Sequence, residues 1–356
     1  MKILFSKILL LIVFIKSLSF CSSQKNHQIT MDNKDTIDIT NYLPKNFVTD
    51  ATVDYTNALQ KAFDENRNIL MPDFPILVNK NGIKIKSNSK VYFQENSKIL
   101  LKPTESGSYG LLYIVDVKNV EVYKPVLIGD RFNHLGKSGE WGMGIRIIKS
   151  EKILIDSAQI SECWGDGIYV GGGDFPNKNI KINNSEISQC RRNGISITNV
   201  DSLIVKSTKI SDIYGTPPMA GICVEPNSKE NRVNNIFLED IQTENIEHFG
   251  IVIALNRNVG STEEVKIYID HHIDNNSTSG ICFAGFKEKK LGEDQLKGEI
   301  IIKNSTWNNN QKPINISNFT LAPKTYIKNT KIVKNEIEKL MNKEDFGLKN
   351  TNIIIE

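Results

Sequence analysis

A four-residue phrase, in which glycine is followed by an apolar, a variable and an apolar residue, returns six times along the chain. Each phrase has the period-two pattern of a short strand with one buried face. The steps between successive glycines are 23, 27, 27, 29 and 30 residues. This near-regular spacing predicts stacked units of one shape. The glycines are Gly144, Gly167, Gly194, Gly221, Gly250 and Gly280.

A second alternating segment trails the phrases, as at residues 153–155, 180–182 and 203–205. Asn, Ser, Asp and Gly lie between the segments, and helical patterns are rare. Two or three strands per period are typical of one turn of a parallel β-solenoid, not of a crossover unit. We therefore predict an all-β fold, a single-stranded right-handed parallel β-helix of roughly nine turns of ~27 residues. Its Ile and Val side chains fill one interior.

The start of the chain has the pattern of an export signal. Lys2 and Lys7 flank an apolar run at residues 8–15, which is too short and too early for a membrane span. We predict that residues 1–21 are a signal peptide. The protein is then exported: secreted, periplasmic or held at the outer surface as a lipoprotein.

Cys21 is the candidate lipidation site. Leu18, three residues earlier, resembles the bacterial lipoprotein signal in which the cysteine is acylated, whereas Phe20 stands where that signal has a small residue. Acylation at Cys21 and plain cleavage nearby both remain open. Membrane contact is expected only through such an N-terminal lipid anchor.

Behind the signal we expect a linker at residues 22–45, one parallel β-helix domain at 46–335 and a C-terminal cap or tail at 336–356. No second hydrophobic core is apparent in the sequence. Near the C-terminus, residues 334–346 are expected to form a short helix and residues 352–355 a final strand.

One amphipathic helix is predicted near the N-terminus, at residues 54–66, where Ala58, Leu59, Ala62 and Phe63 share a face. A solenoid leaves an open apolar end, and a helix across that end covers it. We therefore assign this helix to capping and not to chemistry.

Charge and cysteine content exclude several classes of protein. The net charge of +3 is nearly balanced, so no nucleic-acid partner is expected. Five cysteines are too few for a disulfide scaffold. Since no Cys and His cluster has zinc spacing, we predict no metal and no cofactor, with Ca²⁺ the one ion left open.

The cysteines also follow the repeat. Cys163 and Cys190 each stand four residues before their glycine, which stacks them on adjacent turns ~4.8 Å apart. A disulfide and a ladder of buried thiols both fit this placement. Cys223 and Cys282 share another position but lie two turns apart, too far to pair.

The opening of the domain resembles the N-terminal segment of the pectate lyase (pectin lyase-like) superfamily. An Asp-containing loop, a helix carrying Ala58 and Leu59, and a strand ending at Pro72 follow its order, and the similarity covers most of residues 45–330. The resemblance implies the right-handed parallel β-helix of an exported protein. The superfamily includes polygalacturonases, pectate lyases, uronate epimerases, phage tailspike depolymerases and noncatalytic surface proteins.

The catalytic motifs of those enzymes are mostly missing. Polygalacturonases carry a paired Asp-Asp, a Gly-His-Gly and an Arg-Ile-Lys, whereas residues 165–168 hold a single Asp, no Gly-His-Gly exists, and residues 146–149 carry one residue too many. The clustered aspartates that hold calcium in pectate lyases are also absent. The resemblance therefore transfers no catalytic residue.

Residues at equal offsets from the repeat glycine stack into columns, because each turn lies on the last. Trp141 and Trp164 both stand three residues before their glycine. Two indoles in one column suit stacking on sugar rings, and packing under a loop is the alternative. One outer face of four turns is thus expected to carry Glu140, Trp141, Arg146, Trp164, Asp166, Tyr169, Arg191, Arg192 and Glu225.

Such residues suit an acidic polysaccharide, since arginine binds uronate or sulfate and a carboxylate supplies acid or base. A longer loop at residues 129–145 breaks the repeat and adds His134. The catalytic candidates are Asp166, Glu225, Glu140, Arg146 and His134. The substrate-binding candidates are Trp141, Trp164, Tyr169, Arg191 and Arg192.

A glycoside hydrolase needs two carboxyl groups ~5.5 Å apart for retention or ~6.5–9.5 Å apart for inversion. Strand spacings separate Asp166 from Glu225 by ~10 Å along the axis and ~16 Å along the strand. Glu140 is therefore the better partner for Asp166. For Asp166 the alternative is ordinary turn chemistry in a Gly-Asp-Gly corner. A lyase would instead use Arg146, Arg192, Tyr169 or His134.

We therefore predict an exported carbohydrate-active enzyme, either a polysaccharide lyase or a glycoside hydrolase. It cleaves a uronate-containing or otherwise acidic glycan in a groove on the outer face of the β-helix. The alternative is a noncatalytic glycan-binding or structural surface protein. In either case the expected partner is a polysaccharide or oligosaccharide. The sequence does not indicate an oligomeric state.

Overall fold

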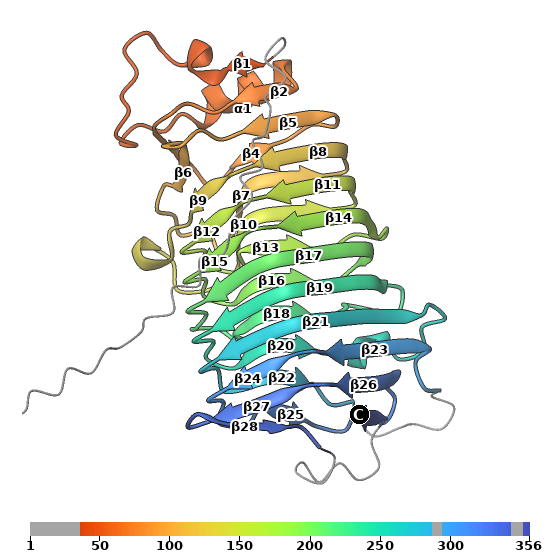
Figure 1. The fold of residues 1–356 in the computed structure, drawn as a ribbon. Helices are drawn as coiled ribbons and strands as arrows, with labels where there is room; N and C mark the ends of the chain where they lie inside the picture. The colour runs from red at the N-terminus through yellow and green to blue at the C-terminus, as the bar shows by residue number, and fades with distance from the viewer. Residues whose placement is uncertain (1–35, 287–293, 343–351) are drawn as a thin grey trace, which may run out of the picture. The chain divides into compact units, whose positions relative to one another are not determined.

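The computed structural model describes residues 36–286, 294–342 and 352–356. Within them the chain coils through parallel strands that pair turn on turn, as Figure 1 shows. The predicted all-β parallel solenoid is therefore confirmed. The predicted signal peptide at residues 1–21, with Cys21, lies outside the described residues.

A nine-stranded sheet takes one strand from each of nine turns. In it Ile145 pairs with Ile168, Ile168 with Ile195, and Ile195 with Ile222. The predicted phase of the glycine repeat is thus confirmed. The strands are β4 (Ile83–Lys84), β7 (Ser108–Val115), β10 (Trp141–Ile148), β13 (Ile168–Val170), β16 (Asn193–Ile197), β18 (Ala220–Val224), β20 (Phe249–Ile253), β22 (Ser279–Phe283) and β25 (Ile314–Ile316).

A twenty-stranded sheet forms the rest of the wall. Many turns give it two strands, separated by a corner residue with positive φ such as Ser157, Asn184 or Asn304. The strands are β1 (Ile37–Asp38), β2 (Asn68–Leu70), β3 (Pro75–Val78), β5 (Ser89–Tyr92), β6 (Lys98–Leu101), β8 (Lys118–Tyr123), β9 (Val126–Ile128), β11 (Glu151–Asp156), β12 (Gln159–Ser161), β14 (Asn177–Asn183), β15 (Glu186–Ser188), β17 (Val200–Ser211), β19 (Val233–Glu244), β21 (Val265–Asn275), β23 (Gly298–Lys303), β24 (Thr306–Asn308), β26 (Lys324–Lys328), β27 (Lys331–Lys334), β28 (Ile337–Leu340) and β29 (Ile353–Ile355).

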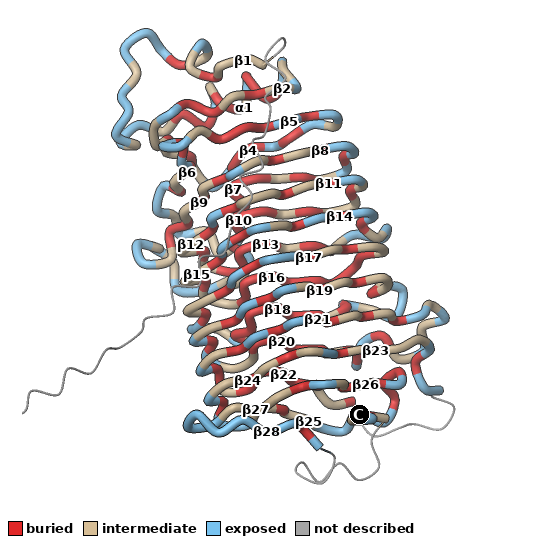
Figure 2. Tube along the Cα trace, viewed as in Figure 1, coloured by how far each residue is buried: buried red, intermediate tan, exposed pale blue. Residues whose placement is uncertain are grey.

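The interior between the two sheets is mostly apolar, and buried positions recur along each strand in Figure 2. The repeat glycines lie where a side chain of the opposite wall comes close. A Cβ at Gly144 would lie 2.6 Å from Cγ2 of Ile160, and one at Gly280 would collide with the ring of Trp307. Glycine recurs because the interior has no room for a Cβ at this position.

One section of the interior is polar. His272 on β21 is fully buried, with Nε2 at 2.8 Å from Oγ1 of Thr243 and Nδ1 accepting a 3.2 Å hydrogen bond from Nε1 of Trp307. Because the Trp307 nitrogen can only donate, Nε2 of His272 must carry the hydrogen. The Thr243 hydroxyl donates to Asp274 at 2.5 Å. Burial lowers the pKa of His272 to about 3 and raises the pKa of Asp274.

The predicted N-terminal helix is confirmed as α1 (Thr56–Glu65). The amide of Thr56 donates a 3.0 Å hydrogen bond to Oδ1 of Asp54, and Leu59 and Phe63 are buried in the same core as the strands. In Figure 1 the helix lies at the end of the coil that carries β1 and β2. Short 3₁₀ segments are η1 (Ile39–Tyr42), η2 (Arg131–Asn133) and η3 (Asn256–Asn258).

The prediction of a helix at residues 334–346 is wrong for residues 334–342, the part of this segment that the structure describes. β27 extends the parallel ladder beside β24, and β28 returns antiparallel to β27. Asn335 and Glu336, between these strands, have φ of 50° and 64°, as a two-residue hairpin turn requires. The final strand expected at residues 352–355 is confirmed by β29, which pairs with β26.

Cys163 and Cys190 are free and buried, so the thiol ladder is the alternative that the structure shows. Their Sγ atoms lie 3.7 and 3.5 Å from the carbonyl oxygens of Ser161 and Ser188, two residues earlier in each case. The two cysteines therefore repeat one local geometry on adjacent turns.

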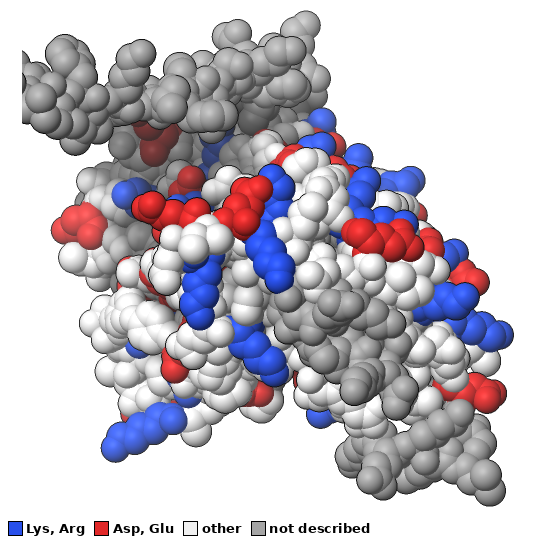
Figure 3. All heavy atoms as spheres, turned by 60° about the horizontal axis from the view of Figure 1, so that its bottom comes forward, with Lys and Arg blue, Asp and Glu red and all other residues white. Residues whose placement is uncertain are grey.

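Positive and negative side chains are interspersed over the described part of the face in Figure 3. Among the residues that the structure describes, no three His, Cys, Asp or Glu side chains group as a metal site. Nor does that part of the chain contain a helix long and apolar enough to cross a membrane.

Candidate functional site

A groove of about 750 Å³ lies on the outer face of the nine-stranded sheet, over β10, β13, β16 and β18. Seven of the ten predicted site residues line it: Glu140, Trp141, Arg146, Asp166, Tyr169, Arg192 and Glu225. The other three, His134, Trp164 and Arg191, do not line it. The predicted columns therefore bring most of the candidates to one surface.

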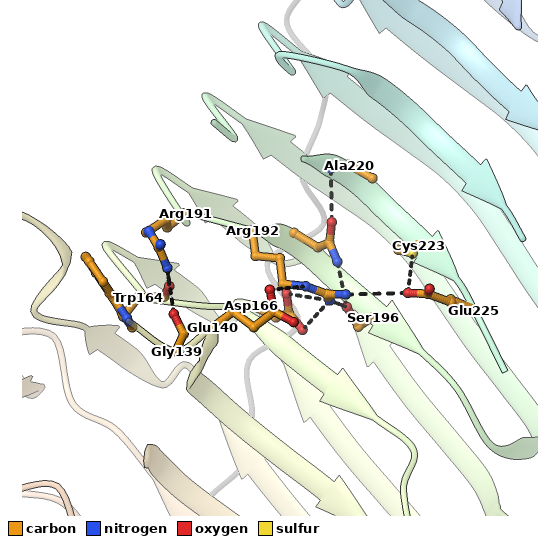
Figure 4. A network of polar contacts seen from close by, with 11 residues as sticks. Gly139, Glu140, Trp164, Asp166, Arg191, Arg192, Ser196, Ala220, Cys223 and Glu225 are labelled. Carbon is orange, nitrogen blue, oxygen red and sulfur yellow. Dashed lines mark hydrogen bonds and ion pairs between the residues drawn. The ribbon is translucent and has the colours of Figure 1, made fainter. Parts of the chain in front are cut away.

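Arg192 lies among three carboxylates, as Figure 4 shows. Its Nη1 is 3.4 Å from both carboxylate oxygens of Asp166, and its Nη2 is 3.4 Å from Oε2 of Glu225. Its Nε is 3.8 Å from Oε2 of Glu140, an ion pair too long for a hydrogen bond. This Nε has no hydrogen-bond partner among the described residues.

The three carboxylates differ in exposure. The side chain of Asp166 is 1% exposed, whereas those of Glu140 and Glu225 are each 33% exposed. Burial raises the pKa of Asp166, and Arg192 opposes that rise. Burial also disfavours the charge on Arg192, but Asp166 and the two glutamates hold its pKa above the usual value. A ligand in the groove can reach the glutamates, while Asp166 supplies a buried counter-charge.

The expectation that strand spacing keeps Glu225 away from Asp166 is wrong. Because each carboxylate contacts a different nitrogen of the planar Arg192 guanidinium, their nearest oxygens are no more than about 9 Å apart. By the same reasoning, contacting oxygens of Glu140 and Glu225 are no more than about 9.5 Å apart. Backbone spacing overestimated the separation because it ignored how far the side chains reach.

Residues that were not among the candidates support Arg192. Nδ2 of Asn193 donates to Oγ of Ser196 at 2.9 Å, and its Oδ1 accepts from the amide of Ala220 at 3.0 Å. Oγ of Ser196 lies 3.4 Å from Nη1 of Arg192. Both residues are buried and occupy the columns of Asp166 and Arg146, so the register contained the signal that would have found them.

Cys223 forms another buried part of the groove wall, and its Sγ lies 3.9 Å from Oε2 of Glu225. Burial, reinforced by the charge of Glu225, raises the pKa of this thiol well above its usual range. Cys223 is therefore a neutral neighbour of Glu225 and not a nucleophile.

Arg146 is a groove cation without a carboxylate partner among the described residues. Its Nη1 makes a 3.5 Å contact to Oγ of Ser108, and its Nε is buried with no hydrogen-bond partner among the described residues. Unlike Arg192, it has no ion pair to a described carboxylate. Tyr169, on the next turn, has its hydroxyl 3.0 Å from Oγ1 of Thr198. The groove thus offers an unpaired guanidinium beside a phenol.

The two tryptophans have different environments. Trp141 is 53% exposed and lines the groove. Trp164 has the ring of His134 stacked at 3.9 Å and the guanidinium of Arg191 at 3.8 Å from its ring centre. Two groups so close to one ring centre must occupy opposite faces. The sugar-platform interpretation is therefore wrong for Trp164, which packs under the loop instead.

His134 belongs to a buried network beside the groove. Its Nδ1 lies 2.8 Å from Oδ2 of Asp130, whose Oδ1 accepts a 2.7 Å hydrogen bond from the hydroxyl of Tyr109. The same hydroxyl accepts a 3.0 Å hydrogen bond from the amide of Trp164. With its side chain fully buried, His134 is placed to hold the loop at residues 129–140, between β9 and β10, and not to meet a substrate.

Arg191 fixes the same loop from the other side. Its Nη1 donates a 2.9 Å hydrogen bond to the carbonyl of Gly139, the residue before Glu140, while its guanidinium covers Trp164 (Figure 4). Arg191 therefore positions Glu140 through the backbone, and its charge does not face the groove.

Comparison with known proteins identifies a family to which the chain belongs. A family model described as "Right handed beta helix region" matches residues 107–285, half of the chain. Two uncharacterized proteins of Bacillus subtilis are similar: the SPbeta prophage-derived protein YorA, 28% identical over 169 residues, and YclG, 31% identical over 160 residues. These matches cover 42% and 40% of this chain but only 29% and 27% of the two relatives.

Solved structures share the fold at low identity. PfbA, a surface adhesin of Streptococcus pneumoniae, has a TM-score of 0.61 at 14% identity, covering 90% of this chain and 82% of PfbA. The tailspike of Escherichia coli bacteriophage HK620, solved with a pentasaccharide, has a TM-score of 0.62 at 11% identity, covering 84% of this chain and 57% of the tailspike. A galactohydrolase whose name specifies galactose-4-sulfate and anhydrogalactose-2-sulfate has a TM-score of 0.55 at 13% identity, covering 77% and 71%.

Proposed function

Since the chain belongs to the right-handed β-helix family, we propose that it is an exported enzyme that cleaves an acidic polysaccharide in the groove over β10, β13, β16 and β18. The observation that carries this proposal is the pair of partly exposed glutamates, Glu140 and Glu225, held by one guanidinium. Glycoside hydrolysis needs two carboxyl groups on either side of the scissile bond. The limit of about 9.5 Å set by Arg192 is compatible with the spacing of such pairs.

In this mechanism one glutamate protonates the leaving oxygen and the other takes a proton from the attacking water or attacks the sugar itself. Asp166 is too buried to meet the substrate. It acts as a positioning residue, because its charge keeps Arg192 in place and Arg192 in turn orients both glutamates.

The acidic substrate is argued from Arg146. Arg146 lines the groove and forms no ion pair with a described carboxylate, so its guanidinium can pair with an acidic group of a ligand. Carboxylate or sulfate groups match the planar donors of arginine. Trp141 supports this assignment, because an exposed indole beside the groove can stack on a sugar ring.

Export is proposed from the sequence of residues 1–21. It agrees with the setting of two structural neighbours, a surface adhesin and a phage tailspike. Secretion and anchoring through Cys21 are distinguished by labelling cells with a palmitate analogue and comparing wild type with Cys21→Ser.

The test uses purified protein with polygalacturonate, alginate and carrageenan, assayed for new reducing ends and for unsaturated products by ultraviolet absorbance. Glu140→Gln and Glu225→Gln are each expected to lower turnover about 100-fold or more. The matched control is Glu239→Gln, since this glutamate on β19, whose side chain is 40% exposed, pairs with Lys206 away from the groove. If neither groove variant changes turnover more than a few fold, the assignment is wrong, and unsaturated products would indicate a lyase.

A noncatalytic glycan-binding protein is the second candidate. It is favoured by the pairing of all three groove carboxylates with Arg192, an arrangement that also serves a static binding surface. Binding of a polymer without any new chain ends supports this candidate over the enzyme.

A further inference from the structure

A second cavity of about 540 Å³ opens next to the groove, where the chain turns from the nine-stranded sheet into the larger sheet. Three corner loops line it: residues 171–176 after β13, 225–232 after β18 and 254–264 after β20. On the turn of β16 the corner is only residues 198–199. The cavity lies where this short corner leaves a gap between longer loops.

The same three loops border both cavities. The loop after β13 gives Gly173 to the groove and Phe175 to the second cavity. The loop after β18 gives Asn227 to the groove and Lys229 to the second cavity. The loop after β20 gives Arg257 to the groove and Gly260 to the second cavity. A chain-like ligand leaving the groove past these loops therefore enters the second cavity.

The second cavity has the chemistry of a sugar site. Phe175 is 70% exposed on its rim, held out by a turn in which Gly172 and Gly173 have φ of 69° and 71°. Lys178 and Lys229 add exposed cations.

The wall of this cavity is braced by Arg232, which contacts Asp201 at 3.2 Å and Glu263 at 3.1 Å. These two contacts join the loops after β18 and β20 and the start of β17. An apolar ring, two exposed ammonium groups, of which Lys229 lies 3.9 Å from Glu230, and a braced wall suit a pyranose that bears an acidic group.

We infer that this second cavity is a distal subsite for the same acidic glycan, so that the protein acts on polymer chains in preference to short oligosaccharides. The inference rests on the proposed function for the identity of the ligand. It adds Phe175 and Lys229 as specificity-determining residues that contact sugars several positions away from the scissile bond.

The test measures binding separately from cleavage. Glu225→Gln protein, which is expected to bind without turnover, is titrated with polygalacturonate, alginate or carrageenan and with a trisaccharide from each. Adding Phe175→Ala is expected to weaken polymer binding about fivefold while leaving trisaccharide binding unchanged. Phe132→Ala is the matched control, because Phe132 is 53% exposed but lines neither cavity. Melting temperatures establish that all variants are folded.

The outcomes separate the two proposals. Unchanged polymer binding in the Phe175→Ala protein, with wild type cleaving the polymer, overturns the distal subsite and leaves the enzyme assignment intact. Weaker polymer binding without cleavage by wild type supports the subsite and refutes the enzyme. Equal losses for trisaccharide and polymer also overturn the inference, because Phe175 would then act at the groove itself.

Discussion

Nη1 of Arg192 lies 3.4 Å from both carboxylate oxygens of Asp166, although 26 positions separate the two residues in the chain. They meet because Asp166 stands one residue before Gly167 and Arg192 two residues before Gly194, on adjacent turns. The buried carboxylate and the largely buried guanidinium compensate each other, and Glu140 and Glu225 share the same cation.

Arg192→Ala is expected to destabilise the protein by about 3–5 kcal/mol, because it leaves Asp166 buried without a counter-charge. Asp166→Asn removes that charge, so the double variant Asp166→Asn/Arg192→Ala should be more stable than Arg192→Ala alone. Calorimetric melting of the four proteins measures the coupling. A double variant no more stable than Arg192→Ala would contradict the pairing.

For the positioning role of Asp166, the variant Asp166→Asn should lower kcat with little change in KM.

Arg146→Ala is expected to raise KM for an acidic polymer about tenfold, since a charge-assisted hydrogen bond to the ligand is lost. The difference from wild type should shrink as ionic strength rises. Arg67→Ala serves as control, because this exposed arginine at the N-terminal end donates only to backbone carbonyls. An unchanged KM would remove Arg146 from the binding site.

Ligand binding should change the fluorescence of only one of the three tryptophans. Trp141 is exposed at the groove, whereas Trp164 is covered on both faces and Trp307 is fully buried. The response to polymer should therefore vanish in Trp141→Phe and persist in Trp164→Phe. Persistence of the full signal in Trp141→Phe would place the sugar elsewhere.

His272 makes the protein less stable as the pH falls below about 6.5. Its folded pKa of about 3 lies below the unfolded value of 6.5, so the unfolded chain takes up a proton that the folded chain refuses. Each pH unit in this window costs up to about 1.4 kcal/mol. Protonation would also set an N–H of His272 against the N–H of Trp307. Buried Asp274, whose pKa is raised, opposes the trend as the pH approaches its folded pKa.

The effect of His272 is measured by unfolding between pH 7 and pH 5. His272→Gln should flatten the slope there, whereas His271→Gln, its exposed neighbour, should not. An equal slope in wild type and His272→Gln would show that another group is responsible.

The sequence predicted the strand ladder and most of one surface, because equal offsets from an in-phase glycine must stack in a solenoid. That reasoning placed Glu140, Asp166 and Arg192 on one face. It failed for the distance between Asp166 and Glu225, because register predicts only where backbone atoms lie. The long side chain of Arg192 extends along the groove and contacts both carboxylates.

The glycine repeat predicts the structure least well where the repeat is interrupted. The 129–140 loop is longer than the corresponding loops of the neighbouring turns, residues 102–107 and 162–167, so the stacking of His134 and Arg191 on Trp164 could not be predicted from columns. At the C-terminus, a Lys- and Glu-rich segment with good helix formers suggested a helix. Pairing with β24 and the turn at Asn335 and Glu336 determine the observed hairpin instead.

The two-residue corner at 198–199 has an implication for how such proteins diversify. Added residues there would project into the gap between its neighbours and leave the strand pairings of β16 and β17 in place. Doubling the length of a flexible loop costs only about 0.6 kcal/mol in closure entropy. Insertions at this one corner can therefore change the shape of the second cavity while the coil beneath stays unaltered.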